Sequence, residues 1–228
     1  MQPRDGHRAG LDALLLAATV PNGASGRLLD MGAGTGAAGL AAADLHPALD
    51  VTLAERDPVM LAALDATLHL PDQSFAARAR VVPVDLEAPA VERERAGLRP
   101  AAFQHALANP PFNPPSHRPS PDTRRAAAHG LSNDTFEQWC RTAAHALAAD
   151  GALAMILRPA SLPDLLAAWR GRFGGPTLLP VHTRPGGATR LLARGVRGAR
   201  APLALLPSLS VDAAMRAALG EGTARIAM

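Results

Sequence analysis

Residues 26–36 read GRLLDMGAGTG, and this stretch decides the fold. It begins with the apolar residues of a short buried strand and continues with glycines at alternate positions, Gly32, Gly34 and Gly36. Glycine lets the backbone adopt positive φ angles and approach a ligand closely. The alanine-rich residues 36–46 then predict a helix. A strand, a glycine turn and a helix in this order are typical of α/β sheets that bind nucleotides at the carboxyl ends of their strands.

Asp30 ends the predicted first strand and stands just before the glycine turn, residues 32–36. Dinucleotide-binding sites share the glycine pattern, so the turn alone does not identify the ligand. A carboxylate at this position would repel a pyrophosphate, but it suits the ammonium group of a methionine moiety. We therefore expect S-adenosyl-L-methionine as the cofactor, bound by Asp30, Met31 and the three glycines of the turn.

Two more carboxylates stand at the ends of predicted strands. The second and third predicted strands, residues 51–55 and 80–85, end in Glu55 and Asp85. Glu55 can accept hydrogen bonds from both ribose hydroxyls of the cofactor. Asp85 can accept one from the adenine amino group, while the next backbone N–H donates to the adenine ring. The predicted cofactor site also includes Arg56 and Leu86.

Residues 103–108 predict a fourth buried strand, and the NPPF motif, Asn109-Pro110-Pro111-Phe112, follows it directly. The amino nitrogen of adenine is a poor nucleophile because its lone pair is delocalised into the ring. The Asn109 side-chain oxygen and the Pro110 carbonyl can accept its two N–H groups and stabilise the positive charge that develops during methyl transfer. The prolines fix the carbonyl directions, and Phe112 offers a face on which a base can stack. We expect all four residues to be catalytic.

The glycine turn and the NPPF motif, in this order and spacing, resemble the motifs of the S-adenosylmethionine-dependent amino-methyltransferases. The chain resembles, over nearly its whole length, the bacterial tRNA (adenine-N6)-methyltransferase family, whose best-known members modify adenosine 37 of a valine tRNA. Residues 7–18 resemble the family's opening motif, and residues 188–195 resemble its closing hairpin.

This resemblance implies an α/β fold, the Rossmann-like class I methyltransferase fold. The implied sheet has seven mostly parallel strands and a C-terminal antiparallel hairpin, with helices on both faces. The resemblance also implies contacts with the target adenine at residues 109–112. The cofactor contacts that it implies are Asp30, Gly32, Glu55, Asp85 and Asn109.

Residues 113–130 predict a long loop directly after the NPPF motif, and we expect this loop to contact the substrate. Arg118, Arg124 and Arg125 in the loop, together with Arg8, are candidate contacts to the phosphates of an RNA substrate, most simply a tRNA. Every basic residue of the chain is an arginine, so a solvated loop made basic by arginine bias is the alternative. The net charge of +3 allows nucleic-acid binding without demanding it.

The 228 residues predict one methyltransferase domain spanning residues 1–228. Residues 1–25 predict a helical lead-in rather than a signal peptide, because Asp5 and Asp12 interrupt the apolar run. The later strands are predicted at residues 152–157, 177–181 and 188–193, and the last two form a hairpin. Further helices are predicted at residues 57–70, within 86–100, and at 132–149, 161–173 and 211–219.

The single cysteine, Cys140, cannot form an internal disulfide, and its neighbours predict a packed thiol. No cluster of histidine and cysteine has the spacing of a metal site, and no apolar run is long enough to span a membrane. We expect a cytoplasmic protein without a metal, either a monomer or a homodimer.

Other functions remain open at this point. A release-factor glutamine methyltransferase would use the same NPP-aromatic chemistry, but such enzymes carry a sizeable helical domain before the glycine turn. A methyltransferase acting on ribosomal RNA or on a small molecule is harder to separate from the tRNA enzyme. A non-catalytic RNA-binding module predicts loss of Asp30 or Asn109, and both residues are present.

Overall fold

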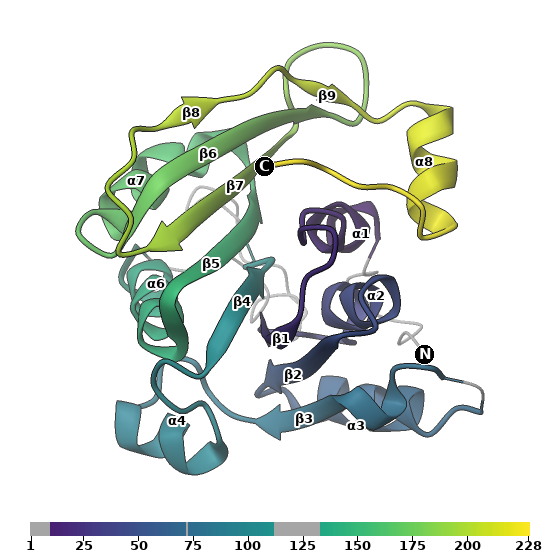
Figure 1. Cartoon of the computed structure of the whole chain (residues 1–228), viewed down its shortest axis with the longest axis vertical. Helices are drawn as coiled ribbons and strands as arrows, with labels where there is room; N and C mark the ends of the chain where they lie inside the picture. The colour runs from purple at the N-terminus through teal and green to yellow at the C-terminus, as the bar shows by residue number, and fades with distance from the viewer. Residues whose placement is uncertain (1–9, 72, 112–132) are drawn as a thin grey trace, which may run out of the picture.

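The computed structural model describes residues 10–71, 73–111 and 133–228 (Figure 1). Its sheet has the strand order β3-β2-β1-β4-β5-β7-β6-β8, and β9 pairs with β6. Neighbouring strands from β3 to β5 are parallel, whereas β7 lies antiparallel between β5 and β6. The strands are β1 (Gly26–Met31), β2 (Leu49–Glu55), β3 (Ala79–Pro83), β4 (Phe103–Ala108), β5 (Leu147–Leu157), β6 (Phe173–His182), β7 (Arg190–Arg197), β8 (Ala204–Leu205) and β9 (Leu209–Ser210).

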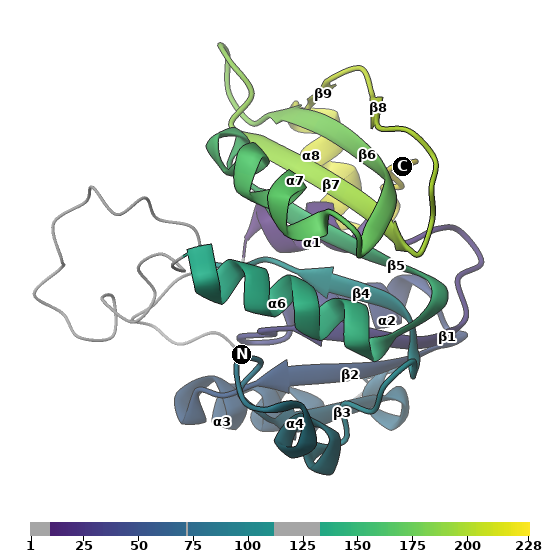
Figure 2. The same ribbon diagram turned by 90° about the vertical axis from the view of Figure 1, so that its left-hand side faces the viewer.

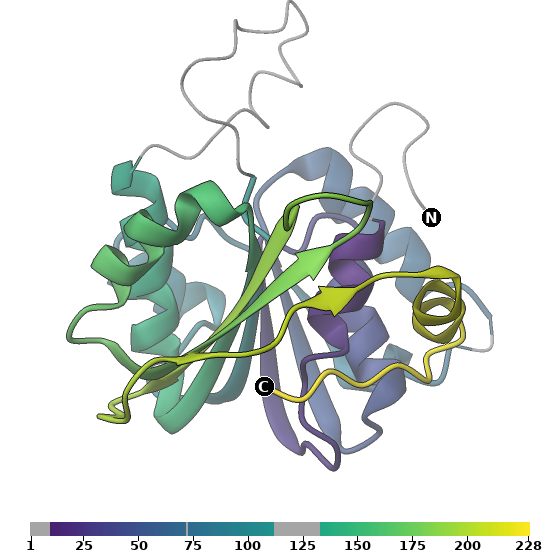
Figure 3. The ribbon, with the colours of Figure 1, turned by 90° about the horizontal axis from the view of Figure 1, so that it is seen from above.

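Helices cover both faces of this sheet, as the view from above shows (Figure 3). One face packs against α1 (Leu11–Ala17), α2 (Ala37–Leu45), α3 (Pro58–Leu68) and α8 (Ala213–Gly220). The other face packs against α6 (Asn133–Ala146), α7 (Leu162–Trp169) and the end of α4 (Ala90–Ala96). Two short 3-10 helices, η1 (Ala76–Arg78) and η2 (Pro159–Ser161), precede β3 and α7. The sheet therefore separates two hydrophobic cores, which is the layering of an α/β fold.

Local sequence explains where α3 begins and where α4 ends. The Asp57 side chain accepts the backbone N–H groups of Val59 at 2.7 Å and Met60 at 3.4 Å, and Pro58 occupies the first turn of α3. This is the expected helix cap, because the first N–H groups of a helix have no partner within it. Gly97 ends α4 with a φ of 109°, a left-handed conformation that glycine adopts without steric cost.

The predicted fold class is confirmed, but the sheet of the described residues contains nine strands rather than seven. The two additional strands, β8 and β9, are only two residues long and pair in parallel with β6. Two residues cannot display the alternation of side chains by which a strand is recognised. The hairpin of β6 and β7 lies where the sequence predicted it.

Several predicted element boundaries are wrong. The third strand ends at Pro83, so Asp85 lies in the following loop rather than in the strand. The helix predicted to reach residue 149 ends at Ala146, because β5 begins immediately at Leu147. The helix predicted at residues 161–173 ends at Trp169, and β6 begins at Phe173.

Candidate active site

The parallel strands bring the predicted site residues to one edge of the sheet. Met31 at the end of β1 is paired with Ala54 of β2 on one side and with Ala108 of β4 on the other. Asp30, Glu55 and Asn109 therefore stand at the carboxyl ends of three adjacent strands. These are the ends at which open α/β sheets bind their ligands.

Asp30 is buried, with 3% of its surface exposed, and its Oδ2 accepts the backbone N–H of Gly39 at 2.8 Å. Burial raises the pKa of Asp30 to about 7, the Gly39 N–H partly opposes this rise, and the nearby charge of Glu55 adds to it. The carboxyl group thus ties β1 to α2. Because its charged form is disfavoured by burial, a cationic group such as an ammonium would favour ionisation of Asp30.

Glu55 is also buried, and its carboxylate accepts three backbone N–H groups. Oε2 accepts from Gly34 at 2.7 Å, and Oε1 accepts from Arg56 and Asp57 at 2.8 Å each. The side chain therefore holds the glycine turn against the end of β2. A carboxylate has about four acceptor sites, so capacity remains for a ribose hydroxyl in addition to these three donors.

The three glycines of the turn are required for different reasons. All have positive φ, with values of 65° at Gly32, 57° at Gly34 and 81° at Gly36. A Cβ atom at Gly32 would lie 2.4 Å from the indole of Trp139, and one at Gly36 would lie 2.4 Å from Leu64. A Cβ atom at Gly34 would meet no atom within 4 Å among the described residues, so this part of the backbone faces open space. The turn, with Glu55 beside it, fits a small ligand that approaches the backbone.

The loop after β3 is held by charged and polar contacts. Arg56 donates from Nη1 to Asp85 Oδ2 at 3.0 Å and to Glu87 Oε1 at 3.5 Å. Oδ1 of Asp85 accepts the backbone N–H of Glu87 at 2.9 Å. Arg56 and Asp85, both predicted to contact the cofactor, are thus already paired with each other. The pair is largely exposed, so it costs little to rearrange when a ligand binds.

Sequence reasoning missed the residues of α6 that support this loop. The buried Thr142 hydroxyl donates to the carbonyl of Leu86 at 2.8 Å, and the Thr135 hydroxyl donates to Glu87 at 3.1 Å. Trp139, one turn from Thr142, lies against Gly32. The amphipathic pattern of α6 indicates which residues face inward, but it contains no information on which loop they meet.

Asn109 directly follows β4 and is half-buried, Pro110 is buried, and Pro111 is half-buried. The first three residues of the NPPF motif therefore lie where the sequence predicted them, at the strand end beside the glycine turn. The remaining predicted contacts lie outside the described residues; these are Phe112, Arg8, Arg118, Arg124, Arg125 and the loop at residues 113–130.

Other predicted features concern the rest of the molecule. Within the described ranges, no three histidine, cysteine, aspartate or glutamate residues gather as a metal site would require. No helix in the described part of the chain is both long and apolar enough to cross a membrane. Cys140 is buried, and burial raises the pKa of its thiol to about 12. This thiol is therefore a packing group rather than a nucleophile.

Comparison with known proteins relates the chain to methyltransferases. The family model of the methyltransferase small domain matches residues 9–166. The crystal structure of a predicted O-methyltransferase from Agrobacterium tumefaciens is 33% identical, with a TM-score of 0.79, and covers 96% of this chain and 99% of its own. No curated protein matches the chain significantly.

Two more distant structures share the fold alone. The glycopeptide N-methyltransferase MtfA with S-adenosyl-L-homocysteine has a TM-score of 0.60 at 14% identity, covering 86% of this chain and 93% of its own. A precorrin-6y methyltransferase from Geobacter metallireducens has a TM-score of 0.54 at 14% identity, covering 82% of this chain and 87% of its own. The chain belongs to the methyltransferase small domain family, and its cofactor is S-adenosyl-L-methionine.

Proposed function

We propose that this protein transfers a methyl group from S-adenosyl-L-methionine to the exocyclic N6 of an adenine in RNA. The observation that carries the proposal is the position of Asn109 directly after β4. The neighbouring strand β1 carries Asp30 at its end and is followed by the glycine turn. In its most specific form, the proposal names adenine 37 of a tRNA anticodon loop as the methylated base. This form rests on the resemblance of the motifs to the tRNA (adenine-N6)-methyltransferases.

The cofactor supplies an electrophilic methyl group on a sulfonium. In the proposed arrangement Asp30 attracts the ammonium of its methionine moiety, and Glu55 accepts from its ribose. Asp85 and the backbone of Leu86 hold its adenine. The Asn109 side-chain oxygen and the Pro110 carbonyl each accept one N–H of the target amino group. These acceptors favour the pyramidal nitrogen and the positive charge of the transition state, and no strong base is required.

An oxygen acceptor is the second candidate, because the 33% identical Agrobacterium protein carries the name of a predicted O-methyltransferase. A ribose or aliphatic hydroxyl becomes a competent nucleophile only as a base removes its proton, whereas the amino nitrogen attacks with its own lone pair and loses one proton to water after the transfer. An asparagine at the strand end cannot act as a base, and for this reason we favour the amino acceptor. Ribosomal RNA, a protein glutamine or a small molecule are further substrates with the same chemistry at nitrogen, and a non-catalytic RNA-binding module is the non-enzyme alternative.

The test is methyl transfer from labelled S-adenosyl-L-methionine into total RNA from a strain that lacks this protein, followed by mass spectrometry of the nucleosides. The proposal expects N6-methyladenosine in the tRNA fraction. A methylated ribose hydroxyl would support the oxygen acceptor instead. The absence of any methylated nucleoside, with cofactor binding measured separately, would overturn the RNA proposal.

A further inference from the structure

A cavity of about 660 Å³ lies beside the loop between β6 and β7, outside the cofactor site. Its lining includes three arginines, Arg158, Arg184 and Arg190, and no acidic side chain among the described residues. Figure 2 shows the β6–β7 loop on the same side of the sheet as the amino end of α6, which is the side at which β4 ends. The cavity thus opens at the edge of the sheet that carries Asn109.

The sheet register places the arginines close to the proposed methyl-acceptor site. Leu157 of β5 is paired with Leu191 of β7, so Arg158 and Arg190, the next residue on each strand, are neighbours. Ala108 of β4 is paired with Met155 of β5, and Asn109 continues this register. With strands about 4.8 Å apart and a rise of about 3.3 Å per residue, the backbones of Asn109 and Arg158 are about 8 Å apart.

The loop that forms the cavity wall is braced by its own hydrogen bonds. The hydroxyls of Thr183 and Thr189 bond at 2.8 Å, and Nδ1 of His182 bonds the carbonyl of Gly186 at 2.9 Å. Arg216 of α8 donates to the carbonyl of Thr183 at 2.9 Å. These contacts hold the loop from both sides.

The charge of the cavity is only partly compensated. Arg190 donates from Nε to Asp12 Oδ2 of α1 at 2.8 Å and from Nη1 to the Thr189 carbonyl at 2.9 Å. Arg158 and Arg184 are exposed, and the structure records no acidic partner for either among the described residues. Three guanidinium groups against one carboxylate leave a net positive charge that an anion can neutralise.

We propose that this cavity binds a phosphate group of the methyl-accepting substrate. Arginine presents planar, paired donors that match the oxygens of a phosphate, and several arginines around one cavity favour a doubly charged anion. The inference rests on the proposed function, because the acceptor base is taken to lie at Asn109. A nucleotide carries a base and a phosphate in one molecule, so it can place the base at Asn109 and the phosphate in the neighbouring cavity. The cavity therefore favours a nucleotide substrate over an uncharged amide side chain.

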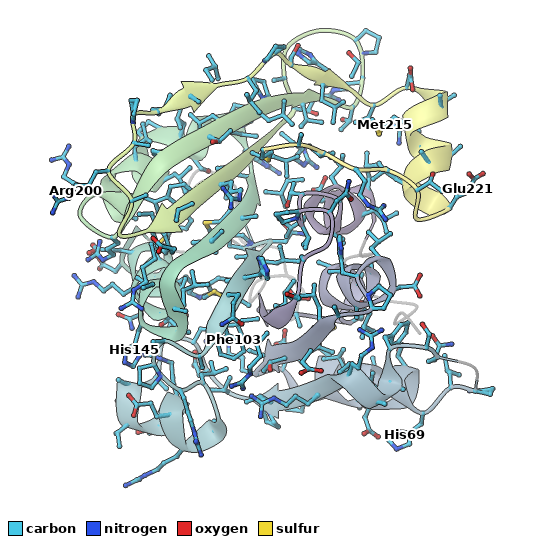
Figure 4. All side chains as sticks on the ribbon, viewed as in Figure 1. His69, Phe103, His145, Arg200, Met215 and Glu221 are labelled. Atoms are coloured by element: carbon cyan, nitrogen blue, oxygen red, sulfur yellow. The ribbon has the colours of Figure 1, made fainter. Side chains whose placement is uncertain are left out.

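The experiment compares two double variants. The cavity variant is Arg158→Ala/Arg184→Ala, and the control variant is Arg170→Ala/Arg200→Ala. The control pair is also exposed and lies outside the cavity, and Figure 4 shows Arg200 pointing away from the molecule. Binding of adenosine, adenosine 5′-monophosphate and a 12-nucleotide oligoadenylate is measured by calorimetry, with S-adenosyl-L-methionine binding as the check on folding. We expect the cavity variant to lose at least tenfold in affinity for the phosphate-bearing probes. Its affinity for the cofactor and adenosine should stay within twofold, and the control variant should resemble the wild type.

The arms of the experiment separate the possible outcomes. Stronger binding of the monophosphate than of adenosine indicates that a single nucleotide supplies the phosphate. If only the oligoadenylate binds more tightly than adenosine, the phosphate in the cavity is an RNA phosphodiester. The affinity of the cavity variant for the oligoadenylate should then also depend less on salt concentration. Phosphate-dependent binding that survives the Arg158→Ala/Arg184→Ala change would overturn the inference. If the variant loses phosphate binding but the wild-type enzyme methylates no RNA, the cavity is a phosphate site and the proposed function is wrong.

Discussion

The carboxylate of Asp30 accepts the backbone N–H of Gly39 at 2.8 Å, which ties the acid at the end of β1 to helix α2. Gly39 can approach this closely because it has no side chain: a Cβ atom there would lie 2.9 Å from Asp30 Oδ2 and 2.6 Å from Leu53. The glycine three residues beyond the glycine turn thus sets the distance between helix and sheet. The position of the acid in the proposed cofactor site depends on this contact.

Gly39→Ala should therefore destabilise the protein by about 1–3 kcal/mol, because the added methyl group overpacks the space between α2, Asp30 and Leu53. Urea unfolding measures this change, and calorimetry should show weaker cofactor binding. Gly220→Ala is the matched control, since a Cβ atom at this helical residue would meet nothing within 4 Å among the described residues. The control should be neutral or slightly stabilising. Equal stabilities of the two variants would contradict the packing argument.

The raised pKa of Asp30 predicts a stability that falls with increasing pH. The pKa is about 7 in the folded protein and 3.8 ordinarily, so the folded state binds the proton more tightly. Asp30 contributes to the free energy of unfolding fully below pH 4, and this contribution is lost as the pH rises through 7. Its size is on the order of 4 kcal/mol. Urea unfolding at intervals between pH 4 and 8 should show a steeper decline for the wild type than for Asp30→Asn. Parallel curves would show that Asp30 titrates normally.

The same pKa predicts that cofactor affinity increases with pH. An ammonium group near Asp30 favours the ionised carboxyl, so binding releases a proton below pH 7. Between pH 5.5 and 7 the affinity for S-adenosyl-L-methionine should rise by up to about tenfold per pH unit. Calorimetry in buffers of different ionisation enthalpy would count the released proton. Asp30→Asn should bind weakly with no such pH dependence, and a wild-type affinity independent of pH would argue against contact with the ammonium.

Asn109→Ala should lower kcat by about 10²–10³-fold, because it removes one acceptor that acts in the transition state. The cofactor dissociation constant should change little, since the glycine turn and Glu55 are intact. Asn109→Asp is the informative comparison, because it keeps an acceptor oxygen at the same position and should retain more activity than the alanine variant. An alanine variant with near wild-type turnover would reject the acceptor mechanism.

Thr142→Val should raise the KM for S-adenosyl-L-methionine several-fold with a smaller effect on kcat, because the Leu86 carbonyl loses its hydroxyl donor. An unpartnered buried carbonyl also costs about 1–3 kcal/mol of stability, which urea unfolding would register. Thr67→Val removes a hydroxyl that bonds within α3 and provides the control. If both variants change stability but neither changes KM, Thr142 does not position the adenine loop.

Much of the site could be predicted because its members follow short local patterns. Asp30 and Glu55 lie at the ends of apolar strands and Asn109 directly follows one, and the carboxyl ends of parallel strands meet at one edge. Asp57 and Pro58 likewise signal the start of α3 by local hydrogen bonding alone. These features are encoded within a few residues of chain, so no tertiary information is needed to find them.

The contacts between distant elements could not be predicted in this way. Thr142 meets Leu86, and Trp139 meets Gly32, because α6 packs across the ends of β1 and β3, and no pattern within α6 specifies these partners. The pairing of Arg56 with Asp85 similarly joins two loops that are separate in sequence. β8 and β9 form only because β6 presents an edge on which two residues can pair.

The sequence by itself determined the class of fold, the glycine turn and the acids and asparagine at the strand ends, because strand, turn and cap preferences act over a few neighbouring residues. Only the tertiary structure decided how α6 supports the loop after β3 and how Arg158 and Arg190 come together. The second of these depends on β7 entering the sheet antiparallel between β5 and β6. Which strands become neighbours is settled by the burial of whole faces and by backbone pairing across the sheet, and those interactions are not local in sequence.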